Sequence, residues 1–181
     1  MWGDMTAFAL SDDFMLNGIV LRGYQAEDLE AMFRLDEACF AEEFRFDRGS
    51  MRKFAEEGEG VVRIAENSAG KIVGFVIAHV EQVASGRRGY VVTLDVAQEW
   101  RRKGLAGRLM SEVEAWALAA GVSWMQLHVF TGNMGAVRFY ERMGYERIRT
   151  RRGFYGGRGL DAFVYGKELR GKEPGQGLVD M

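Results

Sequence analysis

The order of apolar and polar positions along the chain predicts a succession of short strands and helices. β-rich runs occupy residues 19–24, 60–67, 71–82, 90–96, 124–130, 145–155 and 160–169. Helical patterns occupy residues 26–40, 51–58, 105–120 and 133–144. The runs at 60–67 and 71–82 are separated by an Asn-Ser-Ala-Gly turn, which predicts a hairpin. The second half alternates strand with helix, which needs crossover connections, so we expect a mixed sheet rather than a doubly wound one.

Residue spacing within the helical patterns predicts which faces are buried and where the helices end. Leu105, Leu109, Val113, Trp116 and Ala120 recur every three or four residues and predict one buried stripe, with Gly121 as the end signal. In the first helical pattern the apolar face is predicted to hold Leu29, Met32, Phe33 and Phe40. The helix near 51–58 is expected to be capped by Asp47 or Ser50, and a turn is expected at 84–89.

Length and composition favour one ordinary domain with a sizeable core, since the 181 residues are 48% hydrophobic and 28% charged. We expect an N-terminal arm at 1–18, a single domain at 19–170 and a flexible tail at 171–181. The formal net charge of -2 gives no general attraction to nucleic acid. No apolar run reaches the roughly 18 residues that span a bilayer, and the first residues include acids where a signal peptide has positive charge.

The single cysteine, Cys39, cannot form an internal disulfide, and we interpret it as an inert buried thiol in a cytoplasmic protein. His79 and His128, the two histidines, lie far apart in sequence without clustered cysteines, so no metal site is expected. A membrane or nucleic-acid partner is not expected either. The oligomeric state, monomer or homodimer, is left open.

A basic turn between a β-rich run and a helix is the first chemical signal. The segment Arg101–Gly107, RRKGLAG, places arginine and lysine beside glycines at a helix start, where free backbone N–H groups attract anions. An exposed basic turn with no ligand is an equally good interpretation of the spacing alone. The segment is neither a P-loop nor GxGxxG, which disfavours ATP and NAD.

Two segments together resemble the GNAT acetyltransferase superfamily: Val96–Ala106, with the pattern V-x-x-x-x-R-R-x-G-x-A, and Asn133–Tyr140, with N-x-x-A-x-x-F-Y. The resemblance implies a mixed, mostly antiparallel seven-stranded sheet with flanking helices, an α/β (α+β) fold whose central parallel strands splay. It also implies acetyl-CoA as cosubstrate. The pantetheine arm would bind Leu94 and Val96, and the diphosphate would bind at the basic turn. The cofactor-binding residues implied are Leu94, Val96, Arg101, Arg102, Lys103, Gly104, Leu105, Ala106, Gly107, Asn133 and Tyr140.

Within that superfamily the chain is most similar to protein N-terminal acetyltransferases of the NatE type, with the RimI-like type next. The resemblance implies that Tyr90 and His128 handle the proton of the attacking amine, and that Tyr140 donates a proton to the departing CoA thiolate. RimI-like enzymes usually carry glutamate where this chain has His128. Each residue could instead be an ordinary core side chain. Asp95 is a rival base, expected on the opposite strand face from Tyr90 if side chains alternate.

The acceptor entrance is expected at the break after the first helix and at the last hairpin. Phe40, Glu42 and Tyr155, with Phe44 and Phe154, form an acidic and aromatic mouth that suits a cationic N-terminus; a solvated loop with core aromatics is the plainer interpretation. The sequence thus predicts transfer of acetyl from acetyl-CoA to a primary amine, with the α-amine of a protein or peptide as the expected acceptor. The alternatives are a small-molecule amine, or a CoA-binding sensor without catalysis.

Overall fold

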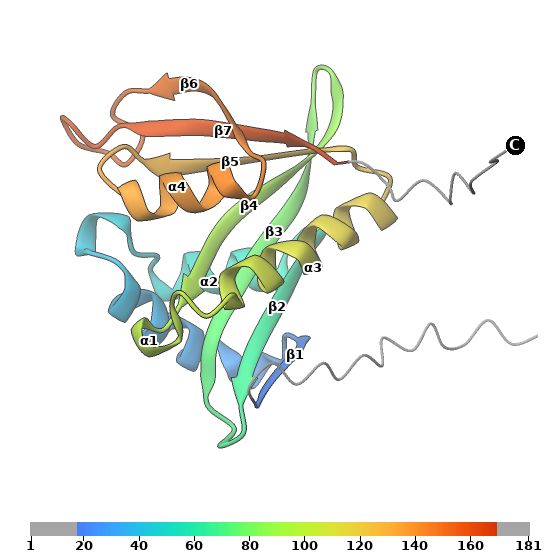
Figure 1. Ribbon diagram of the computed structural model, residues 1–181, viewed down its shortest axis with the longest axis vertical. Helices are drawn as coiled ribbons and strands as arrows, with labels where there is room; N and C mark the ends of the chain where they lie inside the picture. The colour runs from blue at the N-terminus through green and yellow to red at the C-terminus, as the bar shows by residue number, and fades with distance from the viewer. Residues whose placement is uncertain (1–17, 170–181) are drawn as a thin grey trace, which may run out of the picture.

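Residues 18–169 are described by the structure, a computed structural model, and form one seven-stranded sheet (Figure 1). The strands are β1 (Ile19–Gly23), β2 (Gly60–Asn67), β3 (Ile72–Val83), β4 (Gly86–Val96), β5 (Trp124–Phe130), β6 (Glu146–Arg151) and β7 (Ala162–Glu168). Their order is β1-β2-β3-β4-β5-β7-β6, with β4 and β5 parallel and the other neighbours antiparallel. The predicted mixed sheet is confirmed. The expected arm, apart from Gly18, and the expected tail lie outside the described residues.

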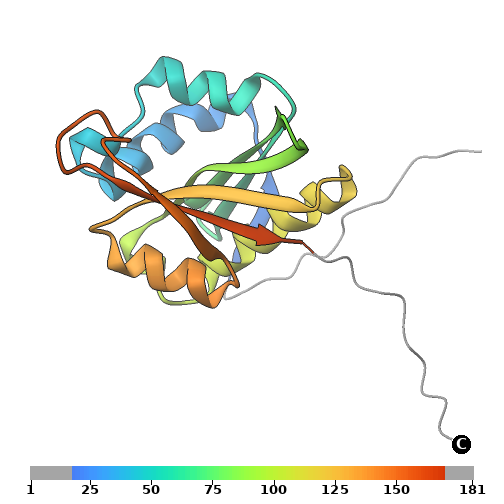
Figure 2. The same ribbon diagram turned by 90° about the horizontal axis from the view of Figure 1, so that it is seen from above.

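Helices cover both faces of the sheet. The chain between β1 and β2 forms η1 (Ala26–Asp28), α1 (Leu29–Cys39), η2 (Glu42–Phe44) and α2 (Arg48–Glu56), and these lie on one face. After β4, η3 (Gln98–Trp100) leads to α3 (Leu105–Ala119), which lies on the other face together with α4 (Met134–Arg142) (Figure 2). Asp47 caps α2, since its side chain accepts from the Ser50 N–H, so the first of the two expected caps is the correct one.

Helix α3 packs the expected stripe on the sheet, with two differences. Leu105, Leu109 and Val113 are buried as predicted, but Met110 and Ala117 complete the buried face, whereas Trp116 and Ala120 are half-buried. The buried residues Leu105, Leu109, Val113 and Ala117 are four residues apart, whereas the helix turns once every 3.6 residues, so the buried face shifts around the helix along its length. Gly121, at φ 74°, ends the helix as predicted, and the next N–H, that of Val122, bonds to the Ala117 carbonyl.

The turn expected at 84–89 is shorter in the structure. β3 continues to Val83 and β4 begins at Gly86, so only Ala84 and Ser85 lie between the strands. Arg87 and Arg88 therefore pair with Gln82 and Glu81 across the ladder. The connection is short, and Gly86, which follows it, has a positive φ of 118° that glycine adopts without a steric penalty.

A β-bulge in β4 changes which side chains share a face. Ile77 pairs with Thr93 and Ala78 with Val91, which leaves Val92 as the extra residue. Since paired residues point to the same side, Tyr90 opposite His79 and Asp95 opposite Phe75 both face α1 and α2. The expectation that Asp95 lies on the opposite face from Tyr90 is therefore wrong, because the bulge interrupts the alternation.

The α3 contact with the sheet yields a stability prediction. Leu109 is fully buried, while Leu118 on the same helix is half-buried. Leu109→Ala should lower the free energy of unfolding by about 2–5 kcal/mol, because it leaves a cavity between helix and sheet. Leu118→Ala is the matched control and should cost clearly less. Urea unfolding followed by circular dichroism measures both, and equal losses would contradict this packing.

Candidate active site

The parallel strands β4 and β5 separate after a short contact. They pair only where Gly89, Tyr90 and Val91 meet Met125, Gln126 and Leu127, although both strands continue beyond. The Ala97 N–H donates to the Val73 carbonyl, so Gly74 and Val96 form a non-hydrogen-bonded pair. The main-chain groups of Val96, and by the same alternation those of Leu94, therefore point away from β3, toward the gap that β5 has left. This is the splay expected from the sequence.

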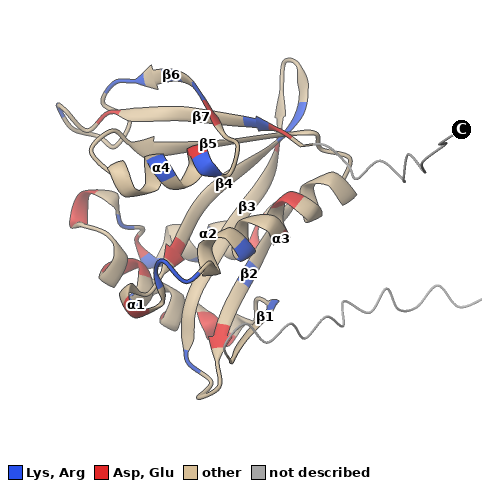
Figure 3. Cartoon of the chain, in the orientation of Figure 1, with Lys and Arg blue, Asp and Glu red and all other residues tan. Residues whose placement is uncertain are grey.

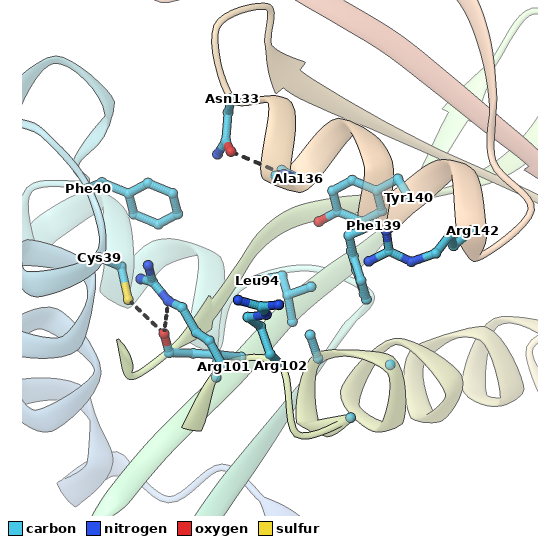
Figure 4. A pocket seen from close by; sticks show the side chains of 15 residues that line it. Cys39, Phe40, Leu94, Arg101, Arg102, Asn133, Ala136, Phe139, Tyr140 and Arg142 are labelled. Atoms are coloured by element: carbon cyan, nitrogen blue, oxygen red, sulfur yellow. Dashed lines mark hydrogen bonds between the residues drawn. The ribbon is translucent and has the colours of Figure 1, made fainter. Parts of the chain in front are cut away.

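A cavity of about 670 Å³ opens at the gap (Figure 4). The N-terminus of α3 forms its floor, where Gly104 at φ 85° and Arg102 at φ 60° turn the chain sharply into the helix. This places the free N–H groups of the first helical turn beside the cavity. Of the residues predicted to bind the cofactor, those that line it are Leu94, Val96, Arg101, Arg102, Gly104, Ala106, Gly107, Asn133 and Tyr140.

Two predicted cofactor residues of the turn do not line that cavity. Lys103 is exposed, with its ammonium 5.0 Å from the centre of the Trp100 ring, and Leu105 is buried in the core. The prediction missed Arg142 and Phe139, which line the cavity from α4. Phe139 belongs to the quoted motif and could have been found from it; Arg142 lies two residues beyond the motif and carries no signal of its own.

Arg101 folds back over the strand rather than pointing to solvent. Its Nε donates to the Val96 carbonyl at 2.8 Å, and the Cys39 thiol donates to the same oxygen at 3.5 Å (Figure 4). Burial raises the pKa of Cys39, with the nearby Asp95 acting in the same direction. The thiol therefore stays protonated at neutral pH. Cys39 is half-buried and lines the cavity, so it is less buried than the sequence had indicated.

Helix α4 brings the second half of the motif to the gap. Asn133 is its N-cap, with Oδ1 accepting from the Ala136 N–H at 3.1 Å. Tyr140 is 8% exposed, and its phenol tip points into the cavity (Figure 4). Burial raises the pKa of Tyr140, with Asp95 as the next cause, so the phenol keeps its proton at neutral pH.

A second cavity, of about 450 Å³, lies on the α1 side of the same gap and shares Leu94, Asn133 and Tyr140 with the first. Aromatic rings close its end: the Phe44 ring lies 4.8 Å from Phe130 and 4.9 Å from Tyr155, between centroids. Phe40 and Tyr155, both predicted acceptor residues, line this cavity. Glu42 is exposed in η2 and is not among its lining residues.

Tyr90 and His128 meet beside that second cavity, which His128 lines. The Tyr90 hydroxyl lies 2.9 Å from His128 Nδ1, and His128 Nε2 is buried with no hydrogen-bond partner among the described residues. The Phe154 ring stacks on the imidazole, with centroids 4.0 Å apart and planes 3° apart. Burial, and then the charges of Arg151, Arg149 and Arg88, lower the pKa of His128 to about 4, so the ring is neutral at pH 7.

Asp36 and Asp95 form a buried carboxyl pair between α1 and β4, close to Val96. Their exposures are 0% and 1%, and one oxygen of each, Asp36 Oδ1 and Asp95 Oδ2, receives no hydrogen bond from elsewhere in residues 18–169. The other oxygens accept from the Phe46 N–H at 3.0 Å and from the Thr93 hydroxyl at 2.5 Å. Burial raises the pKa of Asp36 to about 6 and that of Asp95 well above its usual range. The two carboxyls therefore share a proton at neutral pH.

Within residues 18–169 no group of three or more His, Cys, Asp and Glu side chains could hold a metal ion. The same part of the chain has no helix long and apolar enough to cross a bilayer.

Comparison with known proteins identifies the family. A family model described as "Acetyltransferase (GNAT) family" matches residues 27–145. These residues include β4 and β5, which border both cavities, and the start of α3. The chain belongs to this family. The expected family is confirmed.

The comparison also found individual relatives in sequence. The chain is 33% identical to the catalytic subunit NAA10 of the N-terminal acetyltransferase A complex of Arabidopsis thaliana over 112 residues. That match covers 61% of this chain and 58% of NAA10, so the chain spans less than two thirds of that relative.

Two solved structures show the same fold. The chain superimposes on Arabidopsis thaliana NAA60 in complex with acetyl-CoA with a TM-score of 0.73 and 24% identity, covering 84% of this chain and 99% of that one. It superimposes on the ribosomal-protein-S18-alanine N-acetyltransferase of Escherichia coli with a TM-score of 0.71 and 20% identity, covering 90% and 99%. The predicted cosubstrate, acetyl-CoA, is the ligand in the first of these.

Arg142 offers a test of the larger cavity as the cosubstrate site. Figure 4 shows its guanidinium beside Phe139 at the cavity, where it can meet a phosphate. Arg142→Gln should raise the Kd for CoA by about tenfold, the value of one charge-assisted hydrogen bond. The exposed Arg138 on the same helix is not among the lining residues, and Arg138→Gln should leave the Kd unchanged. Titration calorimetry measures the Kd of both variants. An equal rise in both would indicate a general effect of lost positive charge and would contradict a contact of Arg142 with the ligand.

The Asp36–Asp95 pair predicts a pH-dependent stability. A carboxyl whose pKa rises on folding binds its proton more tightly in the folded state, so its contribution falls as pH rises from about 4 to about 6. His128 has the opposite sign, because its pKa falls on folding and its contribution is lost as pH drops through the same window. Stability measurements on the wild type alone therefore cannot separate the two contributions, but a variant can.

Asp36→Asn removes the buried charge while its amide can still accept from Phe46 and donate to Asp95. Relative to wild type, the variant should gain stability at pH 7.5 compared with pH 5, because it lacks the penalty that grows between these values. Thermal unfolding at pH 5, 6 and 7.5 measures the difference. A constant offset between variant and wild type at all three values would rule out the shared proton.

Proposed function

We propose that this protein transfers the acetyl group of acetyl-CoA to the N-terminal α-amine of a protein or peptide, by direct attack in a ternary complex. The observation that carries the proposal is the Tyr90–His128 pair beside a cavity that meets the cosubstrate cavity at the strand gap. Relatives and neighbours named as N-terminal acetyltransferases support the choice of acceptor. The cytoplasmic location expected from the sequence is part of the same proposal.

The gap between β4 and β5 lets the two substrates approach from opposite faces. The diphosphate lies at the first turn of α3, and the pantetheine arm extends along β4, bonded to the free main-chain groups of Leu94 and Val96. The Val96 carbonyl is already bonded by Arg101, so its N–H and the groups of Leu94 are those left for the arm. The thioester then lies near Tyr140, where both cavities share their lining. The acceptor enters from the α1 side.

His128 accepts the proton of the attacking amine in this proposal. A base with a pKa of about 4 cannot hold the proton of a free α-ammonium, whose pKa is about 8. About one tenth of the α-amine is neutral at pH 7, and its nitrogen becomes acidic as the N–C bond forms. A neutral imidazole suffices at that stage. With Nδ1–H donating to the Tyr90 oxygen, Nε2 has the free lone pair that accepts the proton.

Tyr140 supplies the second proton transfer. Its phenol is protonated, since burial raises its pKa, and it points into the cavity where the thioester sulfur would lie. As the carbon–sulfur bond breaks, the phenol donates to the CoA thiolate. The acetyl group goes to the amine nitrogen, and no covalent intermediate on the enzyme forms.

A double variant tests the roles of the two side chains. His128→Ala with Tyr140→Phe should lower kcat on a peptide α-amine by at least about a hundredfold, because both proton transfers lose their groups. The Kd for CoA, measured by calorimetry, should change little. His79→Ala serves as the control histidine, because its Nε2 bonds to the Phe54 carbonyl of α2.

The acceptor class is tested with an array of free N-terminal peptides, lysine peptides blocked at the N-terminus, and small amines. Turnover only on small amines would replace the α-amine proposal with small-molecule acetylation. Unchanged activity in the double variant would reject the mechanism.

A further inference from the structure

Two arginines of the edge strand β6 face the acceptor side of the sheet. Arg147 pairs with Tyr165 and Arg149 with Val164, so Ile148 is an extra residue in the ladder. Because of this bulge, Arg147 and Arg149 point to opposite faces of the sheet, whereas simple alternation would place them on the same face. Arg149 and Arg151 therefore point to one side of the sheet and Arg147 to the other.

The β7 register shows which side this is. Val164 pairs with His128, and Ala162, the partner of Arg151, pairs with Phe130. Arg149 and Arg151 thus share the face of His128 and Phe130, which line the acceptor cavity. Arg147 lies on the α4 face instead, where its guanidinium is 4.6 Å from the centre of the Phe163 ring.

The two arginines lie close to the reaction centre. The Arg151 guanidinium lies 5.0 Å from the centre of the Phe154 ring, and that ring stacks on His128 at 4.0 Å. Arg149 is level with His128 in the sheet, since both pair with Val164, whereas Arg151 lies two pairs further along the ladder.

Neither charge is neutralised within residues 18–169. Both side chains are exposed, and neither forms an ion pair with a described residue. Arg88 behaves differently, because Glu81 pairs with it at 2.8 Å on the same face. Figure 3 shows basic positions on β6 and acidic positions in the segment that follows α1. Arg152 and Arg158 add exposed positive charge in the connection to β7.

We propose that Arg149 and Arg151 select acceptors with acidic side chains in the first few residues after the reacting α-amine. The inference rests on the proposed function, since it needs a peptide whose α-amine gives its proton to His128. The exposed acids of η2, Glu42 and Glu43, attract the amine, and the arginines of β6 attract the carboxylates beyond it. The mouth therefore carries charge of both signs, whereas the sequence had indicated an acidic one.

A peptide fits this patch better than a nucleic acid does. Binding of nucleic acid draws on many phosphate contacts over an extended basic surface, whereas this patch is narrow, is faced by the acids of η2, and belongs to a chain of net charge -2. Charged residues also protect edge strands from pairing with other chains. That role needs no particular face, so it does not distinguish Arg149 and Arg151 from Arg147.

The experiment compares kcat/KM on sets of free peptides. Within a set, all peptides have the same first residue, and positions two to four are acidic, neutral or basic. Several sets with different first residues are measured. Wild type should prefer acidic to neutral peptides by about three- to tenfold at low salt, from two exposed charge pairs. The preference should shrink as salt screens the charges. The larger effect should lie in KM, because the arginines hold the peptide, and a smaller one in kcat, because an acidic peptide offsets the positive charge beside His128.

Variants separate this role from others. Arg149→Gln with Arg151→Gln should abolish the ratio of acidic to neutral kcat/KM, and the ratio corrects for any change in His128 itself. Arg147→Gln, on the same strand but the opposite face, should retain the preference for acidic over neutral peptides. Arg149→Glu with Arg151→Glu should favour basic peptides.

The outcomes are distinct. Turnover with equal kcat/KM on acidic and neutral peptides overturns this inference alone, and so does equal loss of preference in the Arg147 variant. Retention of RNA by wild type without any peptide preference also overturns it, in favour of a nucleic-acid surface. Absence of turnover on every α-amine overturns the proposed function and this inference with it.

Discussion

The rest of the site depends on one constraint, the separation of β4 from β5 after three paired residues. A strand that loses its neighbour exposes N–H and C=O groups that must find other partners. Here β4 stays paired with β3, and β5 with β7, so each strand is held from its far side while the gap persists. Arg101 and Cys39 satisfy one open carbonyl, that of Val96. The other groups along this edge are free to bind an extended, amide-containing ligand, as the pantetheine arm is.

The gap also explains why donor and acceptor can meet without a large enclosed chamber. The sheet separates the face of α3 and α4 from the face of α1 and α2 (Figure 2), and the two cavities share lining residues at the gap between β4 and β5. Residues shared by both cavities, such as Leu94 and Tyr140, lie at this opening. The start of α3, where we propose that the diphosphate binds, lies on one side, and Tyr90 and His128 lie on the other. In the proposed reaction, bond formation is thereby confined to the point where the sheet is open.

Periodicity predicted the elements well because each strand and helix buries one face against the same sheet. Motif spacing likewise predicted the basic turn, since turns depend on neighbouring residues. The bulges at Val92 and Ile148 could not be predicted, because an extra residue in a ladder is defined only by the partner strand. Each bulge reverses the face on which the later side chains of its strand lie. Asp36 was missed for a related reason: its burial depends on α1 packing over Asp95, a contact between distant segments.

The charges around His128 act on the enzyme and on its acceptor together. Positive charge beside an imidazole favours the neutral ring, so Arg149 and Arg151 help to keep His128 unprotonated, after burial, the larger cause. An acidic acceptor that binds these arginines offsets their field, which raises the basicity of His128 at the moment when a proton must be accepted. Glu81 already does this for Arg88, through an ion pair within the protein. Selection of an acidic peptide and activation of the base are then two effects of the same pair of charges, and a neutral peptide would obtain neither.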